Sequence, residues 1–348
     1  MISERKKQMF QFFLRDKNKK KWPQIIKEFI SLSISQKELP LNYISHLLYR
    51  RDIVNYKDYL SLKENRKLLQ WSYSHAEEQI VLVENKLLFE EILVENGIPT
   101  PSIFFHNMKS KFIYKEDNFQ VTTKNDFLSF LTKVFDEENI GRLFCKPIDG
   151  IRGEHIFIIN KSDYQELGDG LIDLVLTKDF IFQEVIEQHE DLKRINASSV
   201  NTLRIITYKN EQNEVEILSG FIRLGRKGAI IDNAHIGGIV VPLNRKTGVM
   251  DAQGIQLIDN GGGIFHKHPD TGLVFENLQV PLYAQIKEIA SKAASLFKFP
   301  LLGWDIAVTP DGPVIIEANH DFHLLLSDRT EKGLKRNPVV ENLIRQVQ

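Results

Sequence analysis

The spacing of hydrophobic residues divides the chain into a helical beginning and a sheet-rich remainder. Up to about Gly97, apolar positions recur every three to four residues among charged ones, as in the run from Trp22 to Ile30, and this pattern predicts helices. Gly97 predicts the end of a helix, and Pro99 and Pro101 prevent that helix from resuming. Later runs rich in β-branched and aromatic residues have the length of strands, at 102–105, 143–146, 155–159, 180–185, 203–208 and 215–222.

The C-terminal part adds a predicted hairpin. Strands are expected at 303–308 and 313–318, and a Pro-Asp-Gly turn at 310–312 joins them. Helices are expected over 284–297 and 337–348. Together these elements indicate a protein of the α+β class.

Composition and charge narrow the possible partners. Lys and Arg (45) nearly balance Asp and Glu (46), so the formal net charge of −1 gives no long-range attraction for nucleic acid, and we expect no nucleic-acid partner. Cys145 is the only cysteine, which excludes an intramolecular disulfide and favours a reducing compartment. No run approaches the ~18 uncharged apolar residues of a membrane span. We therefore expect a soluble, cytoplasmic protein with no membrane span, and leave peripheral attachment to a membrane enzyme open.

The predicted hairpin carries three oxygen ligands. Asp305 lies in its first strand, while Glu317 and Asn319, two residues apart, point to the same face of its second strand. Two carboxylates and an amide carbonyl suit a hard cation such as Mg²⁺, which completes its shell with water and substrate phosphates. The alternative is a hairpin with solvated acids, but Glu317 follows four apolar residues, where an unpaired charge is costly. The hairpin therefore predicts a nucleotide-metal site.

A lysine and a glycine turn form a candidate phosphate site. Lys146 ends an apolar strand, from which its ammonium can reach a phosphate, and Gly150 and Gly153 follow in the next turn. Backbone N–H groups beside glycines approach phosphate oxygens without a side-chain clash. The segment is neither a Walker A loop nor a dinucleotide fingerprint. An ordinary hairpin with a lysine at its edge explains the segment about equally well.

Two further segments place polar groups beside predicted strands. The apolar run that starts at Phe180 could hold adenine through its backbone in an apolar cleft, although a core strand is the stronger interpretation. Arg204 follows Asn201 at a strand start, where its planar guanidinium could stabilise charge on a transferring phosphoryl group. A surface salt bridge is the alternative for this arginine.

Several polar residues are candidates for substrate contact. Asn233 and His235 lie in a segment with paired glycines, which is either a substrate-facing loop or a tight turn. His320 adjoins Asn319, so it could contact a substrate held near the metal. The other histidines lack the spacing of a zinc site and are interpreted as loop residues.

In their order along the chain, these segments resemble the ATP-grasp superfamily. The stretches at 199–204 and 232–238 are similar to its sugar-transfer-associated branch, and the resemblance covers about residues 86–328. It implies an ATP-grasp fold in which two α+β subdomains clasp ATP, preceded here by a helical N-terminal region. The parts expected are the helical region 1–80, the first subdomain with the phosphate flap at 81–190, and the second subdomain with the metal site at 191–348.

The resemblance also implies roles for individual residues. Lys146 and Arg204 would be catalytic, and Arg204 would steady the transferred phosphoryl group. ATP and Mg²⁺ would be the cofactors, with Asp305, Glu317 and Asn319 as metal ligands. The ATP-binding residues would be Lys86, Lys146, Gly150, Gly153, Gln183, Glu184, Val185 and Ile186, and the substrate-binding residues would be Ser199, Asn201, Asn233, His235 and His320.

The activity that the resemblance implies is an ADP-forming ligase that makes a carbon–nitrogen bond through an acyl-phosphate. Its small-molecule substrates would be an amino acid or similar amine and a carboxylated sugar or other acid, in surface-polysaccharide or secondary metabolism. Two alternatives stay open, an ATP-grasp phosphotransferase and a non-catalytic ATP-binding partner of a glycosyltransferase. Residues 1–80 differ from the α/β domain that begins many ATP-grasp ligases, so the substrate cannot be transferred from them. The oligomeric state is left open, a homodimer included.

Overall fold

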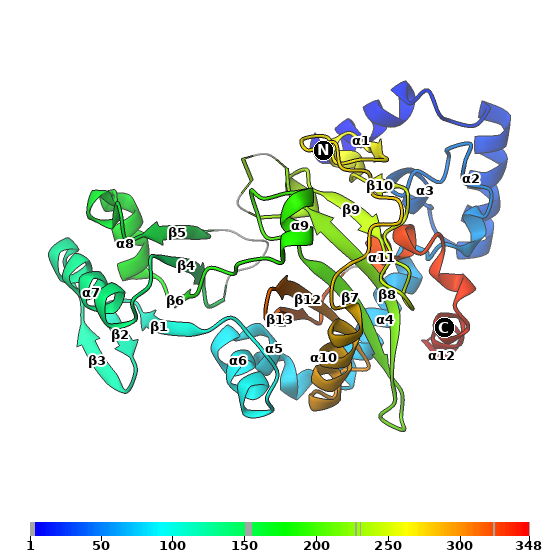
Figure 1. Ribbon diagram of the computed structural model, residues 1–348. Helices are drawn as coiled ribbons and strands as arrows, with labels where there is room; N and C mark the ends of the chain where they lie inside the picture. Colours follow the sequence, from blue (N-terminus) through cyan, green and yellow to red (C-terminus); the bar gives the residue numbers. More distant parts are fainter. Residues whose placement is uncertain (1–3, 150–154, 227, 230, 323, 348) are drawn as a thin grey trace. The chain divides into compact units, whose positions relative to one another are not determined.

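The computed structural model describes residues 4–149, 155–226, 228–229, 231–322 and 324–347 (Figure 1). The chain divides into two compact units. The first contains Met1–Ile80, Gln188–Pro313 and Ala318–Gln348, and the second contains Val81–Glu187 and Val314–Glu317. The helical region therefore groups with the C-terminal sheet, and the predicted three-part division at 1–80, 81–190 and 191–348 stays a prediction.

Helices build the N-terminal part of the first unit. They are α1 (Glu4–Arg15), α2 (Trp22–Gln36), α3 (Asn42–Ser45) and α4 (Leu62–Ser74), with the 3-10 helices η1 (Tyr56–Asp58) and η2 (Glu77–Gln79). A proline in the first turn starts α2, and a capping box between Ser61 and Glu64 starts α4. The core of this region is aromatic, with Phe13, Tyr43 and Tyr49 buried together.

An antiparallel sheet of seven strands forms the centre of the first unit. Its strands are β7 (Leu203–Lys209), β8 (Val215–Leu224), β9 (Ile239–Pro242), β10 (Gly254–Ile255), β11 (Ile264–Phe265), β12 (Leu301–Thr309) and β13 (Gly312–Asn319). Their order is β11-β10-β9-β8-β7-β12-β13. In the pairing of β7 with β12, Arg204 lies directly opposite Asp305. The register therefore brings two of the predicted site residues side by side.

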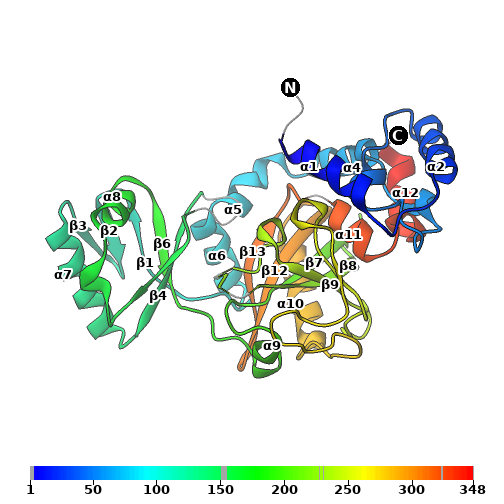
Figure 2. The ribbon, with the colours of Figure 1, turned by 90° about the horizontal axis from the view of Figure 1, so that it is seen from above.

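The first unit has further helices in its C-terminal part. They are α9 (Glu190–Ile195), α10 (Tyr283–Leu296), α11 (Leu324–Thr330) and α12 (Pro338–Val347), with the 3-10 helices η4 (Ala234–Ile236), η5 (Ile258–Asn260) and η6 (Leu334–Arg336). α10 contacts β7, β8 and β12, α11 contacts β8 and β9, and α12 packs against α4 (Figure 2). Leu60, Leu68 and Leu69 share one hydrophobic cluster with residues of β7, β12 and α12, so the N-terminal helices are part of the core of this unit.

Two ion pairs lie inside the helical region. Lys20 Nζ is 2.6 Å from Glu28 Oε2, and both side chains are buried. Arg50 donates to Asp16 Oδ2 at 2.7 Å and to the carbonyl of Gly262 at 3.0 Å. Because a buried charge needs a partner, the second pair holds the helical region against the loop that follows η5.

The second unit is a six-stranded antiparallel sheet with helices. Its elements are α5 (Ile80–Glu84), α6 (Lys86–Glu95), β1 (Ile103–Met108), β2 (Lys111–Tyr114), β3 (Asp117–Gln120), α7 (Lys124–Glu137), β4 (Arg142–Pro147), β5 (Phe157–Asn160), η3 (Tyr164–Glu166), α8 (Asp169–Thr177) and β6 (Phe180–Gln183). The strand order is β3-β2-β1-β6-β4-β5. α7 and α8 pack against the sheet and supply buried residues to its core (Figure 1). The rings of Phe105 and Phe182 stack at 4.2 Å in the middle of that core.

The α+β class expected from the sequence is confirmed, and so are the main strands, with shifted ends. Gly97 follows the end of α6 with a φ of 62°, which a glycine adopts without strain. The predicted strand 155–159 starts later, at Phe157, because His155 has a φ of 57° and lies outside the extended region. The predicted strand 180–185 ends at Gln183. β2, β3, α7 and α8 were not singled out in the sequence, since their apolar runs are short or interrupted by charges.

Replacing Phe182 by Ala should destabilise the second unit by about 3–5 kcal/mol, because the fully buried ring stacks on Phe105 and leaves a cavity when removed. Urea unfolding followed by circular dichroism measures the change. Met108→Ala is the matched control, because Met108 lies on the same sheet and is 53% exposed. Equal midpoints for the two variants would contradict this account of the core.

Candidate functional site

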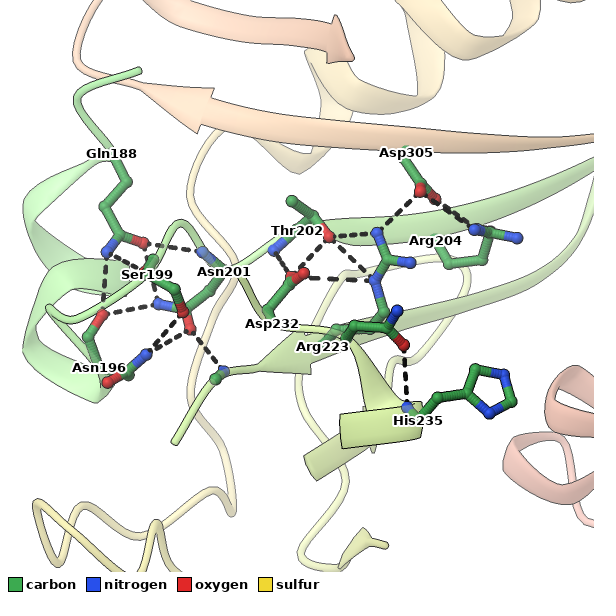
Figure 3. A network of polar contacts seen from close by, with 12 residues as sticks. Gln188, Asn196, Ser199, Asn201, Thr202, Arg204, Arg223, Asp232, His235 and Asp305 are labelled. Carbon is green, nitrogen blue, oxygen red and sulfur yellow. Dashed lines mark hydrogen bonds and ion pairs between the residues drawn. The ribbon is translucent and has the colours of Figure 1, made fainter. Parts of the chain in front are cut away.

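The carboxylate of Asp305 is shared by two arginines of neighbouring strands (Figure 3). Arg204, on β7, donates to both oxygens of Asp305, with Nη2 at 3.0 Å from Oδ2. Arg223, on β8, places Nη2 at 2.8 Å from the same Oδ2. Asp305 is 3% exposed, so its charge is compensated almost entirely by these guanidinium groups and not by water. The sequence predicted Arg204 and Asp305 as site residues, and the structure pairs them.

Arg223 is held in turn by a threonine and a second aspartate. Its Nε and Nη2 atoms donate to Thr202 Oγ1 at 3.0 and 2.5 Å. The Thr202 hydroxyl and backbone N–H both donate to Asp232 Oδ2 at 2.6 Å. Figure 3 shows the resulting row of Asp232, Thr202, Arg223 and Asp305. Because the guanidinium of Arg223 donates to Thr202 on one side and to Asp305 on the other, its orientation is fixed.

Burial affects the ionisation of Asp232, the second aspartate of the row. Burial raises the pKa of Asp232, while the charge of Arg223 and the hydrogen bonds from Thr202 oppose that rise. Two arginines therefore face two buried aspartates, and the group is close to neutral when both acids are ionised. An added anion would be stabilised only if an arginine turned toward it from Asp305.

A second polar network fixes the chain between α9 and β7. Gln188 donates to the carbonyls of Asn196 and Ser199 at 2.9 Å, and its own carbonyl accepts from Asn201 at 2.9 Å. Asn201 has no exposed surface and donates also to the carbonyl of Leu192 at 3.1 Å. Ser199 and Asn201 therefore lie together, in hydrogen bonds within the protein. Their predicted role in substrate binding stays a prediction.

The segment with Asn233 and His235 is a tight turn beside this row. The side chain of Asn233 accepts the backbone N–H of His235 at 2.9 Å, and His235 itself is exposed. Gly238 passes so close to the backbone that a Cβ there would lie 2.6 Å from the carbonyl oxygen of Asp232. The ring of His320 stacks on Phe299, with ring centres 5.6 Å apart.

The second unit brings two lysines and a glutamate into electrostatic contact. Lys146, near the end of β4, is 8% exposed, and in the described part of the chain its ammonium has neither a hydrogen-bond acceptor nor an ion-pair partner in direct contact. Burial, with a smaller contribution from Lys86, lowers the pKa of Lys146 to about 8 against the charges of Glu317 and Glu90. Lys86, the first residue of α6, donates to the carbonyl of Ile148 at 2.8 Å. Burial lowers its pKa as well, against the attraction of Glu317 and Asp149.

Two glutamates lie near these lysines, Glu90 in α6 and Glu184 directly after β6. Burial raises the pKa of Glu90 to about 7, against the backbone N–H of Ile103 and the charge of Lys146. Glu184 accepts the N–H of Ser102 at 3.0 Å. Because Glu90 is partly protonated near neutral pH, the lysines are under-compensated, which is the condition for binding an anion. Of the predicted adenine-binding residues, Gln183 ends β6, and Glu184, Val185 and Ile186 follow it without regular secondary structure.

Some predicted residues are not tested by the structure. Gly150 and Gly153, the expected flap, lie outside the described residues. Asp305 and Asn319 belong to the first unit and Glu317 to the second, and the predicted metal triad stays a prediction. Within the described ranges, no three His, Cys, Asp or Glu side chains cluster as a metal site.

The sequence interpretation missed four residues that the structure brings to these groups. Arg223 is a single arginine near the end of an otherwise apolar run, which is a recognisable signal for a buried, paired charge. Thr202 and Asp232 carry no such signal, because their contact joins positions 30 residues apart. Glu90 is one of two adjacent glutamates in α6, and only packing distinguishes it, half-buried, from the exposed Glu91.

Comparison with known protein families decides the identity of the fold. A family model described as sugar-transfer associated ATP-grasp matches residues 65–339, which is most of the chain. The chain belongs to the sugar-transfer associated ATP-grasp family. The two antiparallel sheets with their helices are therefore an ATP-grasp fold, as the sequence predicted, and a helical region precedes it. A search of curated proteins found no match.

Solved structures with a similar course of the chain are distant from this ATP-grasp protein. A D-alanyl-alanine synthetase A from Vibrio cholerae is 12% identical, with a TM-score of 0.46, and the match covers 76% of this chain and 64% of that one. A biotin carboxylase complex from Campylobacter jejuni is 10% identical, with a TM-score of 0.47, and the match covers 83% and 53%. The chain thus spans less than two thirds of either structure. In the described part of the chain, no helix has the length and apolar character needed to cross a bilayer.

Replacing Thr202 by Val should destabilise the first unit by about 1–3 kcal/mol, because the hydroxyl both donates to Asp232 and accepts from Arg223. Thr202→Ser keeps the hydroxyl and should stay within about 1 kcal/mol of the natural protein. Urea unfolding curves of the two variants measure the difference. If Val and Ser variants unfold at the same concentration, the row of contacts contributes nothing to stability.

Proposed function

We propose that this protein is a magnesium-dependent, ADP-forming ligase that joins a carboxylate to an amine through an acyl-phosphate. The observation that carries the proposal is the buried ammonium of Lys146. It has no acceptor among the described residues, and Lys86 lies near enough to lower its pKa. The buried Lys146 and the half-buried Lys86 lie close enough for their charges to interact, so an anionic ligand is favoured there, and a nucleotide phosphate supplies the charge.

The residues of the second unit suit a triphosphate. Lys86 begins α6, whose helix dipole favours negative charge at this end, although the N–H groups of Leu87 and Leu88 already donate to Asn85 Oδ1. Lys146 offers all three donors of its ammonium, because no protein acceptor occupies them in the described part of the chain. We assign adenine to the segment Gln183–Ile186. Gln183 ends β6 and the N–H of Glu184 already donates to the carbonyl of Ser102, so the backbone groups of Val185 and Ile186 are the ones we propose to bind the base.

The predicted metal ligands are the second part of the proposal. We propose Asp305, Glu317 and Asn319 as ligands of Mg²⁺, which would bridge phosphate oxygens and neutralise developing charge. Two carboxylates and an amide suit this hard cation. Both oxygens of Asp305 already accept bonds from Arg204 and Arg223, so metal binding requires an arginine to exchange this carboxylate for another anion. A phosphate oxygen is a suitable replacement because it accepts the same fork of donors.

The reaction then follows from charge and position. A carboxylate oxygen of the acid substrate attacks the γ-phosphorus, the bond to the β-phosphate oxygen breaks, and ADP leaves. The amine attacks the carbonyl carbon of the acyl-phosphate, phosphate leaves, and the amine gives up a proton. Lys146 offsets charge on the triphosphate and Arg204 offsets charge on the transferred group. No enzyme nucleophile is needed, and Cys145 is buried with its pKa raised by burial.

The substrates are proposed only by class. An amino acid or other small amine and a carboxylated sugar or similar acid fit the description of the family, whose name refers to sugar transfer. We propose a cytoplasmic location, where ATP is available. The residues proposed to contact these substrates are Ser199, Asn201, Asn233, His235 and His320.

Nucleotide affinity should fall as pH rises through 8. Only the protonated form of Lys146 attracts phosphate, and burial lowers its pKa to about 8, so Mg-ATP binding should weaken roughly tenfold between pH 7 and pH 9. Titration calorimetry across this range measures the effect.

Lys146→Arg should remove most of this pH dependence, because arginine stays charged. Lys146→Met should weaken binding at every pH, whereas Lys111→Met, at an exposed position of β2, should leave it unchanged. A pH dependence that persists in the arginine variant would exclude Lys146 as its source.

Hydroxylamine should trap the acyl-phosphate. With ATP, Mg²⁺ and a panel of amino acids and uronic acids, a ligase forms a hydroxamate that mass spectrometry identifies. A stable phosphorylated product would instead show a phosphotransferase.

Glu317→Gln should abolish Mg²⁺-dependent ADP release, while Asp311→Asn, an exposed change in the turn of the same hairpin, should retain it. ADP release by Glu317→Gln at the natural rate would refute the metal assignment.

A further inference from the structure

Helix α2 has apolar residues on two sides. One side carries Ile25 and Leu32, which are buried in the core of the helical region. The other side has apolar residues spaced four apart that stay exposed, namely Trp22 (48%), Ile26 (54%), Ile30 (52%) and Ile34 (73%). Figures 1 and 2 show α2 at the periphery of the first unit in both views. Four large exposed apolar side chains in register on one helix form a continuous strip, which a helix in contact only with water rarely carries.

The strip continues onto the end of α1. Lys19 Nζ donates to the carbonyl of Leu14 at 2.5 Å and lies 5.6 Å from the centre of the Trp22 ring. Phe13 packs edge-on against the same ring at 5.7 Å. Leu14 is itself 56% exposed. We call the exposed apolar residues Leu14, Trp22, Ile26, Ile30 and Ile34 the interfacial strip.

Positive charge surrounds this strip. Residues 1–37 contain ten Lys or Arg and three Asp or Glu, a net charge of +7 in a chain whose total is −1. Two of the three acids, Asp16 and Glu28, are engaged in buried ion pairs. Lys17, Lys21 and Lys27 are exposed beside the strip or within α2. The outward charge near the interfacial strip is therefore strongly positive, against the balance of the rest of the chain.

We infer that the interfacial strip docks on the surface of an anionic lipid bilayer. A helix with a tryptophan and isoleucines on its outer side and lysines along its edges lies in the plane of a membrane interface, with its apolar side chains among the acyl chains. The lysines add attraction to anionic headgroups, which falls with salt. This inference goes beyond the proposed ligase reaction and does not depend on it.

Charge and apolar surface together distinguish a bilayer from other occupants. A second copy of the chain would bring two strongly positive regions face to face, which is unfavourable at low salt. A nucleic acid would satisfy the lysines but leave the isoleucines in water, since phosphate contacts are polar. An anionic bilayer satisfies both properties at once.

Vesicle co-sedimentation of the full-length protein tests the inference. Vesicles of phosphatidylcholine with phosphatidylglycerol should bind the protein, vesicles of phosphatidylcholine alone should bind it at least about tenfold more weakly, and high salt should reduce binding to the anionic vesicles. The combined variant Ile26→Ser, Ile30→Ser and Ile34→Ser should weaken binding about tenfold or more without a change in charge. The combined variant Lys17→Gln, Lys21→Gln and Lys27→Gln should do the same.

A matched control changes exposed apolar residues elsewhere. Val94→Ser, Met108→Ser and Val274→Ser together replace side chains of 58%, 53% and 54% exposure and should bind as the natural protein does. Circular dichroism verifies that each variant is folded. Tryptophan emission should shift to shorter wavelength on binding, and Trp22→Phe should remove this shift, because Trp304 is fully buried and Trp71 packs against the core cluster of β7, β12 and α12.

Three results would overturn the inference. The first is failure of the natural protein to bind anionic vesicles at low salt. The second is unchanged binding by the isoleucine variant. The third is an alternative occupant: a dimer in sedimentation velocity that the isoleucine variant dissolves assigns the strip to a second copy. Salt-sensitive binding of duplex DNA that the lysine variant loses, without vesicle binding, assigns the surface to nucleic acid.

Discussion

The sharing of one buried carboxylate by two arginines organises the first unit. Asp305 on β12 faces Arg204 on β7 by the register of the sheet, and Arg223 on β8 reaches the same oxygen. Each of these charges is mostly removed from water, so each needs the others. Thr202 and Asp232 extend the group to the chain that leads into the turn at 233–238, and the backbone there is packed too closely for any side chain at Gly238. Three strands and one turn are thereby held by a single polar group.

The second unit uses buried charge differently. In the first unit the arginines are matched by aspartates at short distance, whereas Lys146 has no such partner among the described residues. Burial is the main cause that lowers the pKa of Lys146. Lys86 lowers it as well, and Glu317 partly opposes the decrease. Buried charges that are paired within the protein stabilise its fold. A buried cation without an ion-pair partner can instead bind an anionic ligand. This contrast is the physical basis of our proposal that phosphate binds at the lysines and that an arginine exchanges its partner.

The N-terminal helices have one side that packs into the protein core and another that stays exposed, and composition alone does not distinguish the two. Ile25 and Leu32 of α2 join an aromatic core, and the Arg50–Asp16 pair holds that core against the loop at 262. The same helix leaves Ile30 and Ile34 exposed on its other side. The net charge of the whole chain is near zero, although residues 1–37 are strongly positive, because the other residues carry the compensating negative charge.

The sequence by itself determined the class of fold and the types of group at the site. Strand and helix periods, the glycine after α6 and the residues Lys146, Arg204 and Asp305 depend on local backbone preference and side-chain chemistry, which act over a few residues. Only the tertiary structure decided that Arg223 shares the carboxylate of Asp305. It also decided that Asn201 points into the protein and that one side of α2 stays exposed. These facts depend on register and packing between segments up to about a hundred residues apart, such as the 101 residues from Arg204 to Asp305, and no local pattern encodes them.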